Sequence, residues 1–363
     1  MYLVAHNGAH IWGGAERAVT LILAGLQGRG HRVRLFCADP LVAGRAEGLG
    51  VPAELATLGG DAAVHHAARF ALALRRHRPD ALMIGTYKKL FLASMGARLA
   101  RVPRVVARVG LETDTLRNAK YRVALPRWVD AVVVNASRMA PTFVNAGLKD
   151  VRVIPNAAEV PVRRQPPGAL RAALGIPADA PVVGAVARLA RQKRFDRLLR
   201  AFATLASDTH LVLAGDGEER ETLQALAVEL GIADRAHFLG FRDDTGDVLG
   251  ALDVFVLSSD REGMSNAMIE ALAAGVPVVS TPVSGTEDAL AAAPGEIAPG
   301  VILPGFGEGE LAEALRGVLA DADRRVAMAE AARERARARF AWDAVLAEWE
   351  RVLAPTVARG RGR

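Results

Sequence analysis

The 363-residue sequence contains a single cysteine, Cys37, so no disulfide bond can form within the chain. Cys37 ends the apolar run Val33–Cys37, and there we expect a buried strand residue and not a nucleophile. No run of about 18 uninterrupted apolar residues occurs, which excludes a transmembrane helix. The first residues lack the basic start and the long apolar core of a signal peptide. These absences predict a protein of the reducing cytoplasm.

Several site signatures are also missing. The first predicted strand is not followed by G-x-G-x-x-G, which argues against a Rossmann dehydrogenase. No D-x-D cluster stands at a strand end, and the histidines lack the spacing of metal ligands, so no metal is expected. Zinc-finger and RNP-like patterns are absent, and no nucleic-acid partner is expected. With 51% hydrophobic and 24% charged residues, the composition is that of a globular protein of about two domains.

Short apolar runs alternate with longer helical patterns through the whole chain. Nearly continuous apolar strands that alternate with helices indicate parallel sheets covered on both faces, and therefore an α/β, doubly wound fold. The predicted strands are Tyr2–His6, Arg32–Cys37, Ala81–Ile84, Arg104–Val109, Ala131–Asn135, Val151–Ile154, Val182–Val186, His210–Ala214, Ala236–Leu239, Val254–Leu257 and Val278–Ser280.

A proline-rich, charged connector, Asn156–Pro167, interrupts this alternation and marks a domain boundary. We expect a first Rossmann-like domain over residues 1–160 and a second over residues 168–340. Residues 341–363 would add a final amphipathic helix and a tail. Two doubly wound sheets joined in this way are expected to bind ligands at the carboxyl ends of their strands, on either side of a central cleft.

The charge is divided unevenly between the two halves. Residues 1–165 contain 24 Lys and Arg against 11 Asp and Glu, a net charge of +13, whereas residues 166–363 have a net charge of −7. Such a division predicts that the first half contacts an anionic membrane surface or an acidic acceptor. The candidate contacts are arginines near predicted helix ends: Arg75, Arg76, Arg78, Arg98, Arg101 and Arg104.

The densest chemical signal lies between residues 258 and 279. An apolar strand ends in a polar, glycine-containing turn, and a segment with high helix propensity follows the turn. The backbone N–H groups of Gly263–Asn266 open that helix, with Ser265 or Asn266 as its cap, and free N–H groups there suit a phosphate. Glu262 and Glu270 stand eight positions apart. They are thus separated by about 80° around a helix and about 12 Å along it, so both can reach one elongated ligand.

Two further turns complete the candidate site. The strand Val182–Val186 runs into Arg188, and Lys193 follows at the start of the next helix. Two fixed cations at a strand end suit a diphosphate, because they neutralise the charge that develops on a leaving group. The pair Gly13–Gly14, between the first strand and the first helix, lets backbone approach a ligand closely.

Together these residues resemble glycosyltransferase family 4, whose members have the GT-B fold and transfer sugars from nucleotide-sugars with retention. The E-x7-E motif of that family matches Glu262 and Glu270, and its strand-end Arg and following Lys match Arg188 and Lys193. The family's glycine-rich loops match Gly13-Gly14-Ala15-Glu16 and Gly215-Asp216-Gly217, and its Val-Ile-Pro-Asn-Gly resembles Val153–Asn156. The likeness extends over nearly the whole chain and is strongest in residues 182–290.

The resemblance implies a role for each residue. Glu262 would contact the donor sugar near the reacting carbon, and Arg188 and Lys193 would hold the diphosphate. The remaining donor contacts would come from backbone amides, the ribose-binding carboxylate and the turn beside the base: Gly14, Gly263, Met264, Ser265, Asn266, Glu270, Phe241 and Arg242. The final helix would cross back to the first domain.

The sequence departs from the family pattern at two places. Where the family often has a histidine near the sugar, this chain has Val109 with Arg108 beside it. After Asn156 stands Ala157 instead of the usual glycine. Arg108 and Lys88 are the candidates for contacts on the acceptor side.

The prediction is a metal-independent, cofactor-free retaining glycosyltransferase. Its donor would be a nucleotide-diphospho-sugar, such as a UDP-sugar. Its acceptor would be a glycan or glycolipid of the cell envelope, in lipopolysaccharide core or exopolysaccharide synthesis. The expected location is the cytoplasm, as a peripheral protein at the inner face of the cytoplasmic membrane. Two alternatives remain: a GT-B nucleotide-sugar epimerase and a non-catalytic nucleotide-sugar binding protein.

Overall fold

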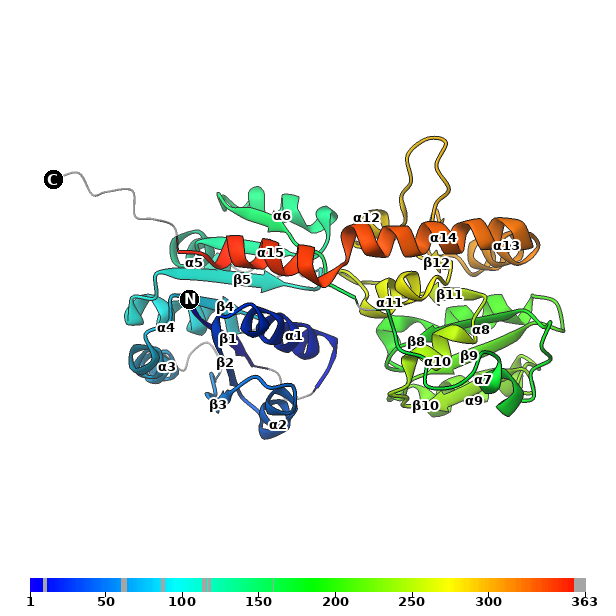
Figure 1. The fold of residues 1–363 in the computed structure, drawn as a ribbon, viewed down its shortest axis with the longest axis horizontal. Coiled ribbons are helices and arrows are strands. Elements are labelled where there is room, and N and C mark those ends of the chain that lie inside the picture. Colours follow the sequence, from blue (N-terminus) through cyan, green and yellow to red (C-terminus); the bar gives the residue numbers. More distant parts are fainter. Residues whose placement is uncertain are drawn as a thin grey trace. The chain divides into compact units, whose positions relative to one another are not determined.

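The computed structural model describes residues 1–8, 12–59, 64–85, 89–112, 116, 119–158 and 160–355. The chain forms two compact units (Figure 1). The first unit contains residues 1–156 and the C-terminal segment that begins at Trp342, and the second contains Ala157–Ala341.

The first unit is built on a parallel seven-stranded sheet with the strand order β3-β2-β1-β4-β5-β6-β7. The register of β1 and β2 runs from Tyr2 opposite Arg32 to Asn7 opposite Cys37. Its strands are β1 (Tyr2–Asn7), β2 (Arg32–Cys37), β3 (Ala53–Leu55), β4 (Ala81–Ile84), β5 (Arg104–Val109), β6 (Ala131–Val134) and β7 (Val151–Val153). All residues of the central strands β4, β5 and β6 are buried, as expected of a sheet covered on both faces.

The segments that connect these strands contain the helices that cover the sheet. They are α1 (Gly14–Gly28), α2 (Pro40–Gly48), α3 (Val64–His77), α4 (Leu90–Ala100), α5 (Ala119–Trp128), the 3-10 turn η3 (Ser137–Met139), α6 (Ala140–Val144) and, from the C-terminal segment, α15 (Trp342–Leu353). Cys37 is fully buried at the end of β2, where the sequence predicted a core residue.

The second unit repeats the plan with a parallel six-stranded sheet in the order β10-β9-β8-β11-β12-β13. Its strands are β8 (Val182–Val186), β9 (His210–Ala214), β10 (Ala236–Gly240), β11 (Val254–Leu257), β12 (Val278–Ser280) and β13 (Gly300–Ile302). Successive residues of β8 belong to different cores: Val182 packs into one cluster and Val183 into the other. This alternation across a strand shows that the sheet is covered on both faces, so both sheets are doubly wound, as the sequence predicted.

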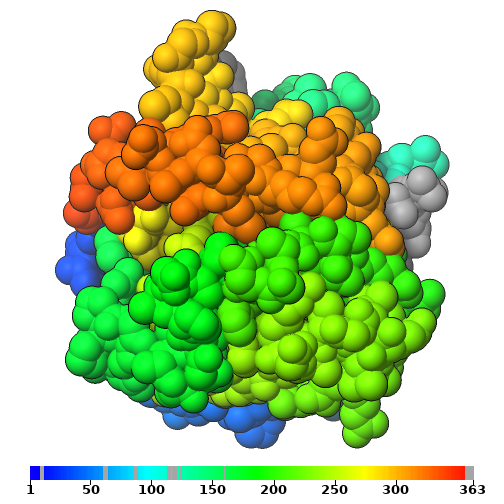
Figure 2. Space-filling model, turned by 90° about the vertical axis from the view of Figure 1, so that its right-hand side faces the viewer, coloured from blue at the N-terminus to red at the C-terminus, as the bar shows by residue number. Residues whose placement is uncertain are grey.

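The helices of the second unit are α7 (Ala169–Ala173), the 3-10 turn η4 (Arg191–Lys193), α8 (Phe195–Ala203), α9 (Arg220–Glu229), α10 (Thr245–Gly250), α11 (Asn266–Ala274), α12 (Thr286–Leu290), α13 (Glu308–Leu319) and α14 (Ala322–Arg339). Figure 2 looks onto this unit, with α13 and α14 in orange across its upper part. The gold loop between α12 and β13 projects from the surface in both views.

The proline-rich connector lies on the second unit and is held there by α10. The backbone N–H groups of Arg164 and Gln165 donate to Asp247 Oδ1 at 2.8 and 3.1 Å. A side chain at Gly246 would place its Cβ 2.2 Å from the carbonyl oxygen of Val162, so only glycine lets the connector approach this closely. The sequence marked this segment as a boundary but gave no sign of α10, which is only six residues long.

Helix α15 closes the first unit by packing against α1. A Cβ at Gly25 of α1 would lie 2.6 Å from a methyl group of Leu346, so the two helices meet where α1 has no side chain. Glu350 receives hydrogen bonds from His31 and Arg29, both at 2.9 Å. The hydrogen bond from His31, and to a smaller extent that from Arg29, holds the pKa of Glu350 below its ordinary value. Trp349 is the largest fully buried side chain and is only 1% exposed.

We expect Trp349→Ala to destabilise the protein by about 3–5 kcal/mol, because it removes a buried aromatic side chain and leaves a cavity beneath α15. Thermal unfolding followed by circular dichroism measures the change. The control is Glu348→Ala, on the exposed side of the same helix, which should leave the midpoint nearly unchanged. An equal midpoint for both variants would show that the docking of α15 contributes little to stability.

Candidate functional site

The candidate site of the second unit lies at the carboxyl edge of its sheet, where the strand order reverses. Strand β8 has β9 on one side and β11 on the other, so the loops after β8 and β11 leave the sheet in diverging directions. Open α/β sheets bind ligands in the crevice formed at such a point. These two loops contain Arg188, Lys193, Glu262 and the start of α11.

Lys193 and Glu262 are brought together as an ion pair. Lys193 Nζ donates to Glu262 Oε1, and the hydroxyl of Ser259 donates to the same oxygen at 3.0 Å. The carboxylate side chain of Glu262 is 11% exposed and the side chain of Lys193 is 22% exposed. The two charges therefore face each other across the switch point in a partly desolvated setting, where their interaction is stronger than in water.

Helix α11 begins directly after this pair. Ser265, one of the two candidates that the sequence offered, is its N-cap, and the hydroxyl of Ser265 accepts a hydrogen bond from the N–H of Met268 at 3.4 Å. The turn before the helix packs tightly, because a Cβ at Gly285 would lie 2.4 Å from the carbonyl oxygen of Gly263. Met264 is 4% exposed, and its side chain packs into the core. Glu270 and Asn266 are half-buried on α11.

Arg188 occupies a more open position. Its side chain is 62% exposed and lies 3.8 Å from the carboxylate of Glu218. Gly215 and Gly217 pack against the backbone on either side of Arg188: a Cβ at these glycines would lie 1.8 Å from the carbonyl oxygen of Ala187 and 2.4 Å from that of Leu189. Both glycines have positive φ, so this loop fixes the backbone of Arg188 in a way that no other residue type permits.

The turn after β10 carries the other two predicted donor contacts. Phe241 is 80% exposed, an unusual exposure for an aromatic side chain, and it leaves a ring face available for stacking. Arg242 is paired with Asp244 through two hydrogen bonds, one of them at 2.7 Å from Nε. This pairing holds the pKa of Asp244 below its ordinary value.

In the first unit, Gly14 begins α1 and the N–H of Gly13 donates to the carboxylate of Glu16 at 3.0 Å.

On the acceptor side, Arg108 is only 4% exposed and donates to Asn156 Oδ1 at 2.8 Å. Burial lowers the pKa of Arg108 to about 10, although the charge of Glu16 opposes this shift. Val109, at the position of the family's usual histidine, packs into the core. Lys88 lies outside the described residues.

Sequence reasoning missed the residues that hold the Lys193–Glu262 pair in place. Asp260 and Ser259 stand inside the motif that the sequence singled out, yet nothing in the pattern separates them from an ordinary polar turn. Arg197 lies on α8 among other arginines, and nothing in the sequence distinguishes it, yet it is 4% exposed and donates to Asp260 at 2.7 Å. Burial of a cation is visible only in the folded chain.

Within the residues that the structure describes, no helix is long and apolar enough to cross a membrane. The same residues contain no cluster of three or more His, Cys, Asp or Glu side chains that could hold a metal ion.

Comparison with known proteins identifies the family. Residues 12–160 match the model of "Glycosyltransferase Family 4", and residues 168–335 match that of "Glycosyl transferases group 1". Over 282 residues the chain is 35% identical to the lipopolysaccharide core biosynthesis glycosyltransferase LpsE of Rhizobium meliloti, with 77% of each chain covered. It is 31% identical over 312 residues to 2-deoxystreptamine glucosyltransferase of Streptomyces kanamyceticus, which covers 77% of this chain and 80% of the relative.

The fold is also that of solved structures. Crystal structures of HepE of Anabaena in complex with UDP and with UDP-glucose superpose with TM-scores of 0.86 and 0.84, at 22% and 23% sequence identity. Each match covers 98% of this chain and 100% of the other. The fold is therefore GT-B, with its two Rossmann-like sheets. With both family models matched, and with 35% identity to a glycosyltransferase over 77% of each sequence, the chain belongs to glycosyltransferase family 4 and is a glycosyltransferase.

Proposed function

We propose that the protein transfers a sugar, with retention, from a UDP-sugar to a glycan or glycolipid of the cell envelope, in lipopolysaccharide core synthesis. The observation that carries this proposal is the Lys193–Glu262 pair at the switch point of the second sheet, directly before the N-terminus of α11. A cation, a carboxylate and the N-terminus of a helix are thus gathered at one edge. They suit a diphosphate joined to a sugar.

Each group has a separate task in the proposed reaction. Lys193 and Arg188 bind the diphosphate and neutralise the charge that develops as it leaves. The backbone N–H groups of Gly263–Asn266 hold its distal phosphate at the helix N-terminus. Glu262 stabilises the positive charge that develops on the sugar ring as the bond to the diphosphate breaks. The acceptor hydroxyl oxygen bonds to the sugar carbon from the face that the diphosphate leaves, and its proton passes to the departing diphosphate oxygen. Glu270 binds the ribose, and the turn of Phe241 and Arg242 borders the base.

The acceptor class rests on the relatives. The matched LpsE is named as a lipopolysaccharide core glycosyltransferase, and the chain spans about three quarters of its length. HepE crystallised with UDP-glucose supports a UDP-sugar donor. Gly14, at the start of α1, would approach the diphosphate from the first unit, and Arg108 and Lys88 remain proposed contacts on the acceptor side.

A donor screen tests the proposal. The full chain is incubated with UDP-, GDP- and ADP-sugars and with lipopolysaccharide cores, and both the released nucleoside diphosphate and the product anomer are measured. Transfer from a UDP-sugar with the donor's anomeric configuration supports the proposal. Conversion of one nucleotide-sugar into another would identify an epimerase, and binding without turnover would identify a non-catalytic protein.

We expect Glu262→Gln to lower turnover by roughly 100-fold at saturating donor, because the charge that stabilises the reacting sugar is lost in a water-poor site. The fold and UDP affinity should be kept, since glutamine can still accept from Ser259. The control is Glu308→Gln, an exposed carboxylate whose side chain is 47% exposed. Turnover close to that of the unsubstituted protein would remove Glu262 from the reaction.

Arg188→Ala and Lys193→Ala should each weaken transfer, and the double variant should lose less than the product of the two single losses. The reason is that both cations act on one diphosphate, so removing the first reduces what the second can contribute. Steady-state kinetics of the three variants measure the coupling. Fully multiplicative losses would mean that the two residues serve separate steps.

An anionic membrane surface is the proposed docking partner of the first unit. Residues 64–104 contain nine Lys and Arg but a single acidic residue, Asp80. On α3, Arg69, Arg75 and Arg76 are exposed around Leu72, which is itself 53% exposed. Arg75 also donates to the carbonyl oxygen of Leu99, a 48% exposed residue of α4. A leucine among arginines on an exposed helix face suits an anionic lipid interface.

Two of the arginines that the sequence offered as contacts do not belong to this surface. Arg104 is 7% exposed and pairs with Asp150 at 2.9 Å, and it also donates to the carbonyl oxygen of Val352 on α15. Arg98 pairs with Asp130 at 2.7 Å. Both therefore stabilise the first unit itself, and the exposed basic surface lies on α3 and at the ends of α3 and α4.

We expect Arg69→Glu/Arg76→Glu to reduce co-sedimentation of the full chain with vesicles containing phosphatidylglycerol by roughly 30-fold or more, since each basic residue near such a surface contributes about 1 kcal/mol. Binding should fade with salt. Arg324→Glu/Arg337→Glu, on exposed positions of α14, makes the same charge change and is the control. Equal loss in both variants, or equal binding to neutral vesicles, would contradict this surface.

A further inference from the structure

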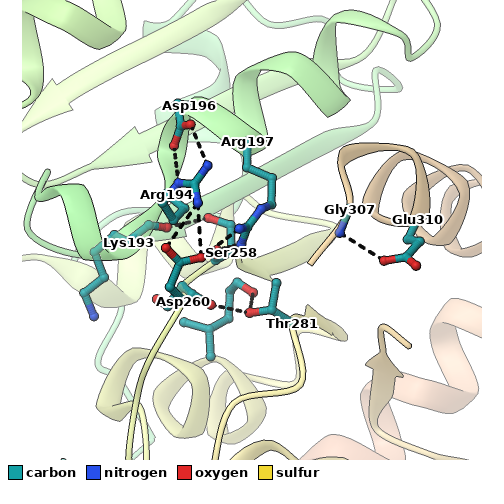
Figure 3. Close-up of polar contacts among 11 residues, drawn as sticks. Lys193, Arg194, Asp196, Arg197, Ser258, Asp260, Thr281, Gly307 and Glu310 are labelled. Atoms are coloured by element: carbon teal, nitrogen blue, oxygen red, sulfur yellow. Dashed lines mark hydrogen bonds and ion pairs between the residues drawn. The ribbon is translucent and has the colours of Figure 1, made fainter. Parts of the chain in front are cut away.

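A buried arginine stands behind the Lys193–Glu262 pair. Arg197 lies on α8, and its side chain is only 5% exposed although it carries a permanent charge. Its Nη1 donates to the carbonyl oxygen of Ser258, and its Nη2 donates to Asp260 Oδ1, both at 2.7 Å. Figure 3 shows Arg197 and Arg194 converging on Asp260 from the same side. A guanidinium that bridges two acceptors in this way fixes their separation.

Those two acceptors belong to the turn that leads to Glu262. The same turn is joined to the segment that contains Lys193 by two further bonds. Ser258 Oγ donates to the carbonyl oxygen of Lys193 at 2.8 Å, and the N–H of Asp260 donates to the carbonyl oxygen of Gln192 at 3.0 Å. Arg197 therefore restrains the turn between Ser258 and Glu262, and this turn is bonded in its place to the segment that contains Lys193.

The remaining neighbours restrain this junction further. Arg194, which pairs with Asp196 at 3.0 Å, also reaches Asp260 at 3.1 Å. Thr281, which follows β12, donates to the carbonyl oxygen of Ser259 at 2.7 Å. Burial alone would raise the pKa of Asp260, but hydrogen bonds from Arg197 and Arg194 hold it below its ordinary value, so this carboxylate stays charged. Phe306 closes the other side, with its ring centroid 5.4 Å from the guanidinium of Arg197.

We propose that Arg197 is a positioning residue for the transfer reaction: through Ser258 and Asp260 it sets the place of Glu262 relative to Lys193 without touching the donor itself. This inference rests on the proposed roles of Glu262 and Lys193. The bonds of Arg197 lie within the protein, behind the turn, so its removal alters the geometry of the pair while leaving both charged groups in the chain. Errors of about 1 Å in the placement of reacting groups can cost 100-fold in rate.

The test is a double-mutant cycle on the full chain, with UDP release from UDP-glucose as the measured rate, or from the donor found in the screen if UDP-glucose is not used. Arg197→Met should lower kcat by about 10- to 100-fold. Arg197→Lys keeps the charge but cannot bridge both acceptors, so its kcat should lie between those of the methionine variant and the unsubstituted protein. Arg200→Met, on the same helix with a 43% exposed side chain, is the matched control and should leave kcat unchanged.

Combination with Glu262→Gln separates positioning from a general loss of stability. If Arg197 acts through Glu262, the double variant should lose much less than the product of the single losses. If the methionine variant unfolds, Asp260→Asn replaces it in the cycle, because this substitution weakens the same Arg197–Asp260 contact and keeps the side-chain volume. Thermal midpoints of all variants are measured in parallel.

The outcomes distinguish the two proposals. If Glu262→Gln lowers turnover but Arg197→Met matches its control, or multiplies fully with Glu262→Gln, the positioning role is wrong and the proposed function stands. If Glu262→Gln leaves turnover unchanged, or the protein turns over no nucleotide-sugar, the proposed function fails and the role of Arg197 fails with it.

Discussion

The contact between Lys193 and Glu262 is the interaction on which the candidate site of the second unit depends. It joins the loops that follow β8 and β11, the two neighbouring strands where the order of the sheet reverses. Two oppositely charged side chains at such a point would be costly to bury singly, and their pairing allows both to lie in a partly desolvated crevice. The glycines at 215, 217 and 285 serve the same edge, because each lets backbone approach where a Cβ would collide.

The first unit is completed by a segment from the other end of the chain. Its sheet depends on a helix from the far end of the chain, and α15 completes the core beside α1 through Leu346 and Trp349. Paired charges around Arg29, His31 and Glu350 fix the position of that helix at the surface. A chain that returns to its first unit in this way links the stability of residues 1–156 to residues more than 180 positions later.

The predicted fold class followed from patterns that depend on few residues at a time. Strands such as Arg104–Val109 and Val182–Val186 were predicted with the bounds that the structure has, because buried parallel strands are continuous apolar runs. The structure also contains short elements that were not predicted: α2, α7, α10, α12, β3 and β13. Segments of three to nine residues are too short to show the hydrophobic repeat of a helix or of a strand. The N-cap of α11 was predicted to within one residue, as Ser265 or Asn266, because capping depends on one residue and its next three neighbours.

By itself, the sequence determined the alternation of strands and helices and the motifs that relate the chain to its family. Spacing along the chain brought Glu262 near the start of α11, because that distance is set by local geometry. Only the tertiary structure decided which charges meet: it paired Lys193 with Glu262, left Arg188 beside Glu218, buried Arg108 and Arg104, and placed Arg197 behind the site. The physical reason is that these contacts join residues 30 to about 250 positions apart, and no local pattern records which polar side chains the core will cover.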